Sequence, residues 1–237
     1  MKSVKKVFNS RMAVWMLVSA TLLSVTSCLD DDDSKIENVA VAYVSLYQGS
    51  PDAPDLDIEV DGRQINAYPF EYTDYTGYLR FYTGERTLRF GPYASSSIEI
   101  DTTVDFEANQ LYSVFVVDEF EDAGIVVTHD NADSPAKGKA KIRVINLSPD
   151  AGDVDLIANG SEDAWSSDLA FKESSDFMEV DAEEYDFQVR SSANNDLLLS
   201  VPDIQLQPRY FYTIIIRGFE TPPSGNPNVL AAQVVVN

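Results

Sequence analysis

A thirteen-residue segment occurs twice in this chain, and it constrains the fold more than any other feature. The first copy, residues 50–62, reads SPDAPDLDIEVDG, and the second, residues 148–160, reads SPDAGDVDLIANG. The copies align without a gap at an offset of 98 residues and are identical at 7 of 13 positions. A chain of 237 residues is long enough for two domains of about 100 residues. The repeat therefore predicts two domains with the same fold.

Both copies of the segment follow a run rich in β-branched and aromatic residues, at 39–47 and 140–147. Within the first copy, acids and aliphatics alternate over residues 55–61, which is the pattern of a half-buried strand. Gly, Pro, Asn and Asp separate the later apolar stretches, and no segment has a sustained helical period. Further strands are predicted at 77–82, 86–90, 97–106, 111–117, 124–129, 177–180, 185–190, 197–201, 210–217 and 229–236.

This spacing of short strands predicts an all-β protein. We expect two tandem antiparallel β-sandwich domains of immunoglobulin-like or transthyretin-like type, at residues 38–130 and 139–237. Residues 131–138 are polar, contain Pro135 and Gly138, and are predicted to be a linker.

The N-terminus has the pattern of a secretory signal peptide, predicted over residues 1–27. Four basic residues precede an apolar stretch at 12–25, which is shorter than the roughly 20 residues that a membrane span needs. The stretch ends at Val25-Thr26-Ser27-Cys28, where Cys28 is the only cysteine of the chain. This ending resembles a bacterial lipobox, so Cys28 is predicted to carry the lipid (palmitate among its acyl chains) that anchors the protein. The alternative is a simple secretory peptide with a chance cysteine.

Four consecutive aspartates, residues 30–33, follow the lipidation site directly. Four adjacent like charges favour a solvated tether, which we expect over residues 28–37. The run also resembles the surface-export signal of Bacteroidetes outer-membrane lipoproteins. Both interpretations can hold together, and they predict a lipid-anchored protein of the outer membrane that faces the cell exterior.

The charge of the chain excludes one class of partner. It has 17 basic and 39 acidic side chains, a net charge of −22. Removal of residues 1–27 takes away four basic residues and no acidic one, which leaves −26. Such a surface repels phosphates, so no nucleic-acid partner is expected, and membrane attachment must come from the lipid.

Seven aromatic residues crowd into positions 68–82, whereas the equivalent span of the second repeat keeps two, Phe171 and Phe177. One interpretation is a hydrophobic core with aromatic cross-strand pairs. The other is a ligand-binding platform, because Tyr offers a rigid apolar face and a hydroxyl. The candidate ligand-binding aromatics are Tyr68, Phe70, Tyr72, Tyr75, Tyr78 and Tyr82, beside Phe81.

The repeated acids are candidate calcium ligands, because carboxylate oxygens are what calcium prefers. They are Asp52, Asp55 and Asp57 with their counterparts Asp150, Asp153 and Asp155. The sequence has no glycine-containing calcium loop of twelve residues, and turn aspartates commonly accept hydrogen bonds from nearby backbone N–H groups. The favoured interpretation is therefore a structural corner, used once in each sandwich.

No catalytic motif is present: there is no nucleophile elbow, phosphate loop or zinc-ligand pattern, and His129 is the only histidine. We expect a protein that is not an enzyme and has no cofactor.

The Ser-Pro-Asp-Ala-x-Asp-x-Asp segment behind a β-strand, with a Tyr-rich strand downstream, resembles the bacterial domain of unknown function 4397 (DUF4397) over residues 38–237. The resemblance implies small β-sandwich modules, often in tandem, on secreted or lipid-anchored proteins, and it implies no activity. The segment at 148–160 departs from the family pattern at Gly152 and Asn159, and Gly49 and Leu147 replace the family's usual His. Two functions remain open: a surface module that binds a glycan, a peptide or another envelope protein, and a structural spacer lipoprotein without a ligand.

Overall fold

A computed structural model of the chain describes residues 39–130, 132–161 and 163–237. Cys28, the four aspartates at 30–33 and the predicted signal peptide lie outside the described residues. Residues 39–237 form one compact unit. Within the described ranges every regular element is a strand except one short 3₁₀ helix, η1 (Phe120–Asp122), and none is a helix that could cross a bilayer. The all-β prediction is confirmed.

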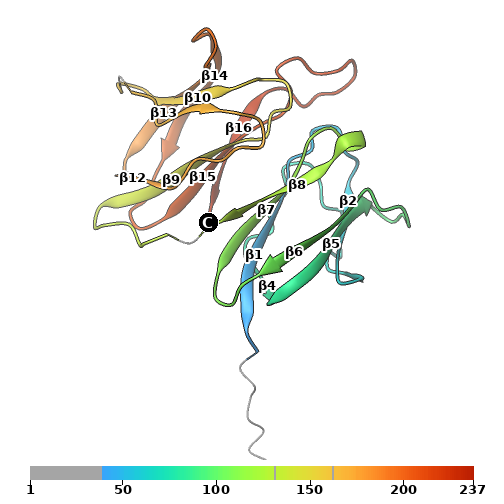
Figure 1. The fold of residues 1–237 in the computed structure, drawn as a ribbon. Coiled ribbons are helices and arrows are strands. Elements are labelled where there is room, and N and C mark those ends of the chain that lie inside the picture. The colour runs from blue at the N-terminus through green and yellow to red at the C-terminus, as the bar shows by residue number, and fades with distance from the viewer. Residues whose placement is uncertain (1–38, 131, 162) are drawn as a thin grey trace, which may run out of the picture. The chain divides into compact units, whose positions relative to one another are not determined.

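The first repeat contains two four-stranded sheets (Figure 1). The front sheet has the order β4-β1-β7-β8, and the back sheet has the order β3-β2-β5-β6. Their bounds are β1 (Val41–Gln48), β2 (Leu56–Val60), β3 (Arg63–Gln64), β4 (Leu79–Tyr82), β5 (Gly84–Pro92), β6 (Ile100–Phe106), β7 (Leu111–Val117) and β8 (Gly124–His129).

The second repeat has the same arrangement, with a front sheet β12-β9-β15-β16 and a back sheet β11-β10-β13-β14. Its strands are β9 (Lys139–Asn146), β10 (Val154–Ala158), β11 (Ser166–Leu169), β12 (Met178–Asp181), β13 (Glu184–Ser191), β14 (Leu197–Gln205), β15 (Phe211–Arg217) and β16 (Ala231–Val236). The four sheets thus make two sandwich-like units. No strand ladder crosses from one repeat to the other among the described residues, and residues 132–138 carry no strand.

The expectation of purely antiparallel sheets is wrong at one place in each repeat. β1 pairs parallel with β7, and β9 pairs parallel with β15. A parallel pair needs a long connection, and here the whole back sheet lies between its two strands in the sequence. The alternation of apolar residues is the same for either direction of pairing, so the sequence pattern did not reveal it.

The paired central strands, β1, β7, β9 and β15, are buried on both faces. On β1, Ala42, Val44 and Leu46 enter the core of the first sandwich, whereas Tyr47 faces the other way. On β15, Ile214 and Ile216 enter the core of the second sandwich, and Ile215 faces the other way. Such strands read as nearly continuous apolar runs because neither face meets water.

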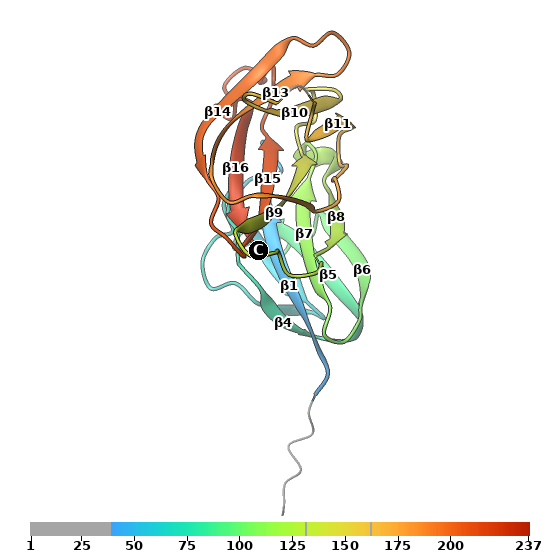
Figure 2. The same cartoon turned by 90° about the vertical axis from the view of Figure 1, so that its left-hand side faces the viewer.

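The outward faces of these strands pack against one another and form a third apolar cluster, which we call the inter-sandwich interface. In Figure 2, β9 and β15 lie beside β1 and β7. Its buried members come from both repeats and are Tyr47, Phe115, Val117, Ile145, Leu147, Ile215 and Val235. Packing these side chains together removes apolar surface of both repeats from water, which holds the two sandwiches together.

Candidate functional site

The two copies of the repeated segment form equivalent corners behind β1 and β9. The carboxylate of Asp52 accepts a hydrogen bond from the backbone N–H of Phe120 at 2.7 Å. Asp150 accepts two, from Glu220 N–H at 2.7 Å and from Thr221 N–H at 2.8 Å. Each aspartate therefore ties its corner to the loop that follows the central strand, β7 or β15. These bonds are of the kind expected for structural turn residues.

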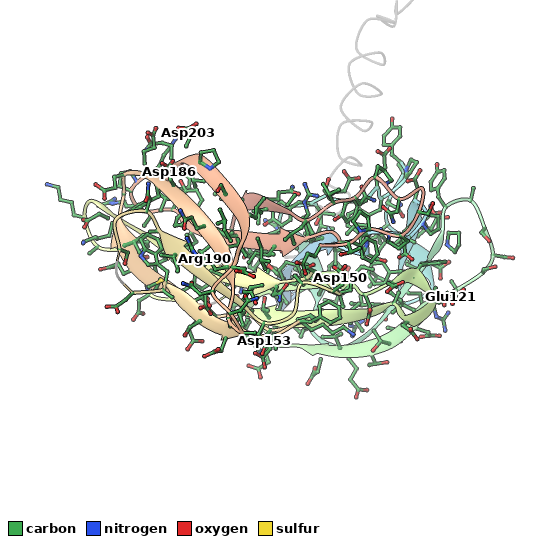
Figure 3. The ribbon with its side chains drawn as sticks, turned by 90° about the horizontal axis from the view of Figure 1, so that it is seen from above. Glu121, Asp150, Asp153, Asp186, Arg190 and Asp203 are labelled. Carbon is green, nitrogen blue, oxygen red and sulfur yellow. The ribbon has the colours of Figure 1, made fainter. Side chains whose placement is uncertain are left out.

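The other repeated acids lie at the start of the back sheets. Asp57 accepts hydrogen bonds from Ala94 N–H and Gln64 Nε2, and Asp155 accepts them from Asp168 N–H and Ser192 Oγ. Both carboxylates thus cap neighbouring loops. Asp55 and Asp153 accept backbone bonds through their main-chain carbonyls. Figure 3 labels Asp150 and Asp153 at the second corner. Within the ranges that the structure describes, no three acidic, histidine or cysteine side chains group closely enough to hold a metal ion.

The structure distributes the seven aromatics of residues 68–82 over three environments. Phe70 and Phe81 lie in the core of the first sandwich, with 4% and 6% of their surface exposed. Tyr72, Tyr75 and Tyr78 are half-buried beside the second repeat, where they meet Arg217, Val236 and Asn237 respectively. Tyr68 and Tyr82 are 81% and 64% exposed. The seven side chains therefore do not form one surface patch, and their absence from the second repeat follows in part from their use at the inter-sandwich interface.

A buried ion pair joins the two repeats at this interface. Arg143 Nη1 lies 2.6 Å from Asp130 Oδ1, and the side chains are 2% and 0% exposed. Arg143 also donates to Thr213 Oγ1 at 2.9 Å and to Ser113 Oγ at 3.2 Å. Asp130 Oδ2 accepts bonds from Ser113 Oγ and from the Tyr78 hydroxyl, at 2.5 Å and 2.7 Å. Every charged atom of the pair thus has a partner, which is the condition under which a buried ion pair is tolerated.

A cavity of about 430 Å³ opens at the free edges of the first sandwich, between edge strand β4 and the β2-β3 hairpin. Its volume lies in the range of small-molecule sites. The lining combines apolar and basic side chains and comprises Val60, Asp61, Arg63, Ile65, Arg80, Phe81, Tyr82 and Arg86. We call it the arginine cavity. Tyr82 and Ile65, at 64% and 41% exposure, give it an apolar surface that solvent reaches.

The arginine cavity has an excess of positive charge. Arg86 donates to Asp61 Oδ2 at 2.8 Å and to the Thr83 carbonyl at 3.0 Å, and it is the only one of the three arginines with an ion-pair partner among the described residues. A hydrogen bond from the Thr87 backbone N–H, reinforced by Arg86, holds the pKa of Asp61 below its usual value, so the carboxylate stays ionised. Three guanidinium groups against one carboxylate leave a local charge of about +2 in a chain of net charge −22.

The second repeat lacks this cavity chemistry at the equivalent positions. Phe81 faces Ala42, and Val180 faces Ala140, so Arg80 corresponds to Glu179 and Tyr82 to Asp181. Arg86 corresponds to Tyr185, whose ring packs on Trp165 at a centroid distance of 4.8 Å. The charge of this edge is therefore reversed in the second repeat, and an aromatic ring occupies the position of the third arginine. Because the fold is shared, the arginine cavity is not imposed by it.

Sequence reasoning missed Arg63, Arg80 and Arg86. A usable signal was present. Arg80 and Tyr82 stand on either side of the core residue Phe81 in a strand, so both side chains must lie on the face of that strand opposite to the core. The comparison of Arg80 and Tyr82 with their acidic counterparts in the second repeat required the strand register, because the offset there is 99 residues and not 98.

His129, the only histidine, packs its ring on Tyr112 with the centroids 4.6 Å apart and lies at the end of β8. It borders a second cavity, of about 410 Å³, beside Arg143 and Phe177. There Arg143 stacks over the Phe177 ring at 4.7 Å, so this guanidinium is held both by the ion pair with Asp130 and by an aromatic face.

The fold is that of an all-β protein with two sandwich-like units, and the first unit carries a cavity lined by arginines and by the exposed Tyr82. A family model described as "Domain of unknown function (DUF4397)" matches residues 42–157, which begin in β1, end in β10 and include the first corner segment and most of the second. The match covers 116 of the 237 residues, and the strands after β10 lie outside it. No curated protein matches the chain in sequence.

Two solved structures illustrate the remote likenesses of the fold. One is a streptococcal virulence factor whose title describes α-glucan binding, with 12% identity and a TM-score of 0.24 over 72% of this chain and 92% of that one. The other is the fimbrial anchor protein Mfa2 from Porphyromonas gingivalis, with 9% identity and a TM-score of 0.23 over 83% of this chain and 97% of that one. At these scores the likeness carries no functional argument.

Proposed function

We propose that this chain is a non-enzymatic binding protein of the bacterial outer membrane, anchored by lipid at Cys28 and exposed at the cell surface. The first sandwich binds an extracellular ligand, a glycan, peptide or envelope partner, at the arginine cavity. The acidic tether at 28–37 holds the sandwiches away from the bilayer.

The observation that carries this proposal is the arginine cavity itself. It places Tyr82 and Ile65 in contact with solvent beside Arg63 and Arg80, neither of which has an ion-pair partner among the described residues. Exposed apolar side chains with convergent donors are the ordinary composition of a ligand site. At the described counterparts of Arg80, Tyr82 and Arg86, the second sandwich has Glu179, Asp181 and Tyr185, and this difference supports a role in binding over a role in folding.

The non-enzymatic part of the proposal rests on what surrounds the titratable side chains. The aspartates of both corners are engaged with backbone N–H groups, and His129 is stacked on an aromatic ring. The serine hydroxyls of Ser113 and Ser192 do donate to carboxylates, those of Asp130 and Asp155. Asp130 is also bound by the buried Arg143, and Asp155 by the backbone N–H of Asp168, so we assign both pairs to structural networks and not to the base-activated nucleophile of covalent catalysis.

The experiment is a binding screen with the full-length chain, purified in detergent, on arrays of glycans and peptides. We expect a discrete set of ligands for the native chain. Replacement of the two solvent-facing residues of β4, Arg80→Ala with Tyr82→Ala, should abolish that set, and Glu179→Ala with Asp181→Ala at the equivalent edge of the second sandwich should leave it intact. Equal signals from both double variants would reject the arginine cavity as the binding site.

A second candidate function, a structural spacer without a ligand, is favoured by the inter-sandwich interface. The buried Arg143–Asp130 pair and the apolar cluster around Tyr47 and Ile215 fasten the two units to each other. A spacer needs that fixed arrangement but makes no use of an arginine cavity, so an array that stays empty for the native chain favours this candidate.

A further inference from the structure

The composition of the arginine cavity also points to the class of its ligand. We infer that the cavity binds a carboxylate-bearing saccharide, an oligosaccharide of uronic-acid type; this inference rests on the binding function proposed above.

The first step concerns charge. Arg63 and Arg80 come from different sheets, on β3 and β4, and both side chains are exposed at the mouth of the cavity. Guanidinium groups bind planar anions through paired N–H donors, and within the described residues neither of these two has an internal carboxylate partner. At physiological ionic strength the Debye length is about 8 Å, so a bound anion responds to these nearby arginines more than to the distant acidic surface.

The second step concerns the third arginine, which is already engaged. Arg86 is fixed by Asp61 and by the Thr83 carbonyl, yet its Nε is buried without a hydrogen-bond partner. A buried N–H without an acceptor costs free energy. Because that Nε is closed to solvent, we expect Arg86 to contribute its positive charge to the cavity and to leave direct donation to the ligand to Arg63 and Arg80.

The third step concerns the apolar part of the ligand. Tyr82 offers an exposed ring beside the guanidinium groups, and rings of this kind stack on flat apolar faces. A pyranose ring with a carboxylate combines such a face with the anionic group. An acidic peptide carries its carboxylates on flexible stems without a flat face. β4 also has only four residues, which makes a short edge for the addition of a peptide strand.

The second sandwich serves as an internal negative control. Glu179 and Asp181 replace Arg80 and Tyr82 there, and Asp181 is paired with Lys139 at 2.8 Å. An anion is repelled at that edge, so the protein should bind one anionic saccharide per chain and not two.

The test uses isothermal titration of the full-length chain in detergent with three probes: tetragalacturonic acid, its fully methyl-esterified form, and tetraglutamate. We expect saturable binding of tetragalacturonic acid at one site per chain and at least tenfold weaker binding of the other two. Arg80→Glu and Tyr82→Asp, which copy the second repeat, should each weaken the acid saccharide at least tenfold. Lys137→Glu makes the same charge change as Arg80→Glu on an exposed residue of the segment between the sandwiches, and it should not weaken binding of the acid saccharide.

Three outcomes would overturn the inference, and each has a different consequence for the binding function proposed above. If the methyl ester binds as tightly as tetragalacturonic acid, and Tyr82→Asp loses this binding, the cavity still binds a saccharide but the ligand need not be anionic. If tetraglutamate binds as tightly as tetragalacturonic acid or more tightly, and Arg80→Glu loses this binding, the cavity is still the binding site but its ligand is an acidic peptide. No binding of any probe at millimolar concentration rejects the uronic-acid class, and the array screen then decides separately whether the cavity binds anything.

Discussion

Asp130 and Asn237 occupy the same position in the two repeats. The backbone N–H of Asp130 donates to the Leu111 carbonyl, and that of Asn237 donates to the Phe211 carbonyl, at the equivalent point of each front sheet. The two side chains meet around one hydroxyl: Tyr78 donates to Asp130 Oδ2 at 2.7 Å, and Asn237 Nδ2 donates to the Tyr78 oxygen at 3.4 Å. Equivalent positions therefore meet at the inter-sandwich interface, but with different side chains, and the charge of Asp130 is matched by Arg143 of the other repeat.

The first prediction concerns this ion pair. Asp130→Ala leaves the Arg143 guanidinium buried without its counter-ion, and such a loss costs about 3–5 kcal/mol of unfolding free energy. The matched control is Asp101→Ala, which removes the partner of Arg89 in an exposed pair and should cost about 0–1 kcal/mol. Urea denaturation of both variants measures the difference. Equal costs would mean that the inter-sandwich interface does not depend on the pair.

The second prediction concerns alkaline pH. Burial, with the nearby Asp130 charge, raises the pKa of the Tyr78 phenol, and burial likewise raises the pKa of Tyr47, Tyr72 and Tyr75. A group whose pKa is raised on folding contributes stability that is complete below its unfolded pKa of about 10 and is lost as the pH rises above it.

The free energy of unfolding should therefore fall steeply above pH 10. Replacement of a single phenol, as in Tyr78→Phe, should make that fall shallower while costing about 1 kcal/mol at pH 8 through the lost bond to Asp130. Urea denaturation at pH 8, 10 and 11 gives the slope directly. If the free energy of unfolding falls with pH as steeply in Tyr78→Phe as in the native chain, ionisation of Tyr78 does not contribute to the loss of stability above pH 10.

Much of the fold was predictable because runs rich in β-branched and aromatic residues, separated by turn residues, indicate strands. The expected strands at 111–117 and 124–129 coincide with β7 and β8. The parallel pairing of β1 with β7 was not predictable, because the sequence pattern along one strand carries no information about the direction of the neighbouring strand. β11, with the sequence SSDL, was missed since its polar residues give no β signal and only its pairing with β10 makes it a strand.

The candidate site was less predictable than the fold. The predicted aromatic stretch 68–82 contains three of the residues that line the arginine cavity, Arg80, Phe81 and Tyr82, but the sequence did not distinguish core residues such as Phe70 from interface residues such as Tyr75. That distinction depends on the outer faces of β1 and β15, which become buried only because the two sandwiches pack together. Arg63, Arg80 and Arg86 come from three separate strands, and only the sandwich edge brings them to one cavity.

The third prediction concerns the corner aspartates. Asp150→Ala removes the acceptor of two backbone N–H groups, whereas Asp52→Ala removes the acceptor of one. We expect Asp150→Ala to cost about 1–3 kcal/mol and Asp52→Ala less. Since these carboxylates are occupied by the backbone, millimolar calcium should neither release heat nor shift the melting temperature of the full-length chain. A calcium-dependent shift that Asp150→Ala abolishes would restore the calcium hypothesis.

The fourth prediction concerns the anchor, which lies outside the described residues. Cys28→Ser removes the thiol that lipidation requires, and the anchoring energy of about 0.8 kcal/mol per buried methylene is lost with it. The protein should then leave the membrane fraction, and mass spectrometry of the native N-terminus should show an acylated Cys28. Substitution of Asp30, Asp31, Asp32 and Asp33 by Asn should keep the lipid and the membrane fraction but abolish digestion by a protease added to whole cells. Only the charge changes in that variant. If the protease still digests the protein on whole cells, the acidic run is a tether and not a signal for surface export.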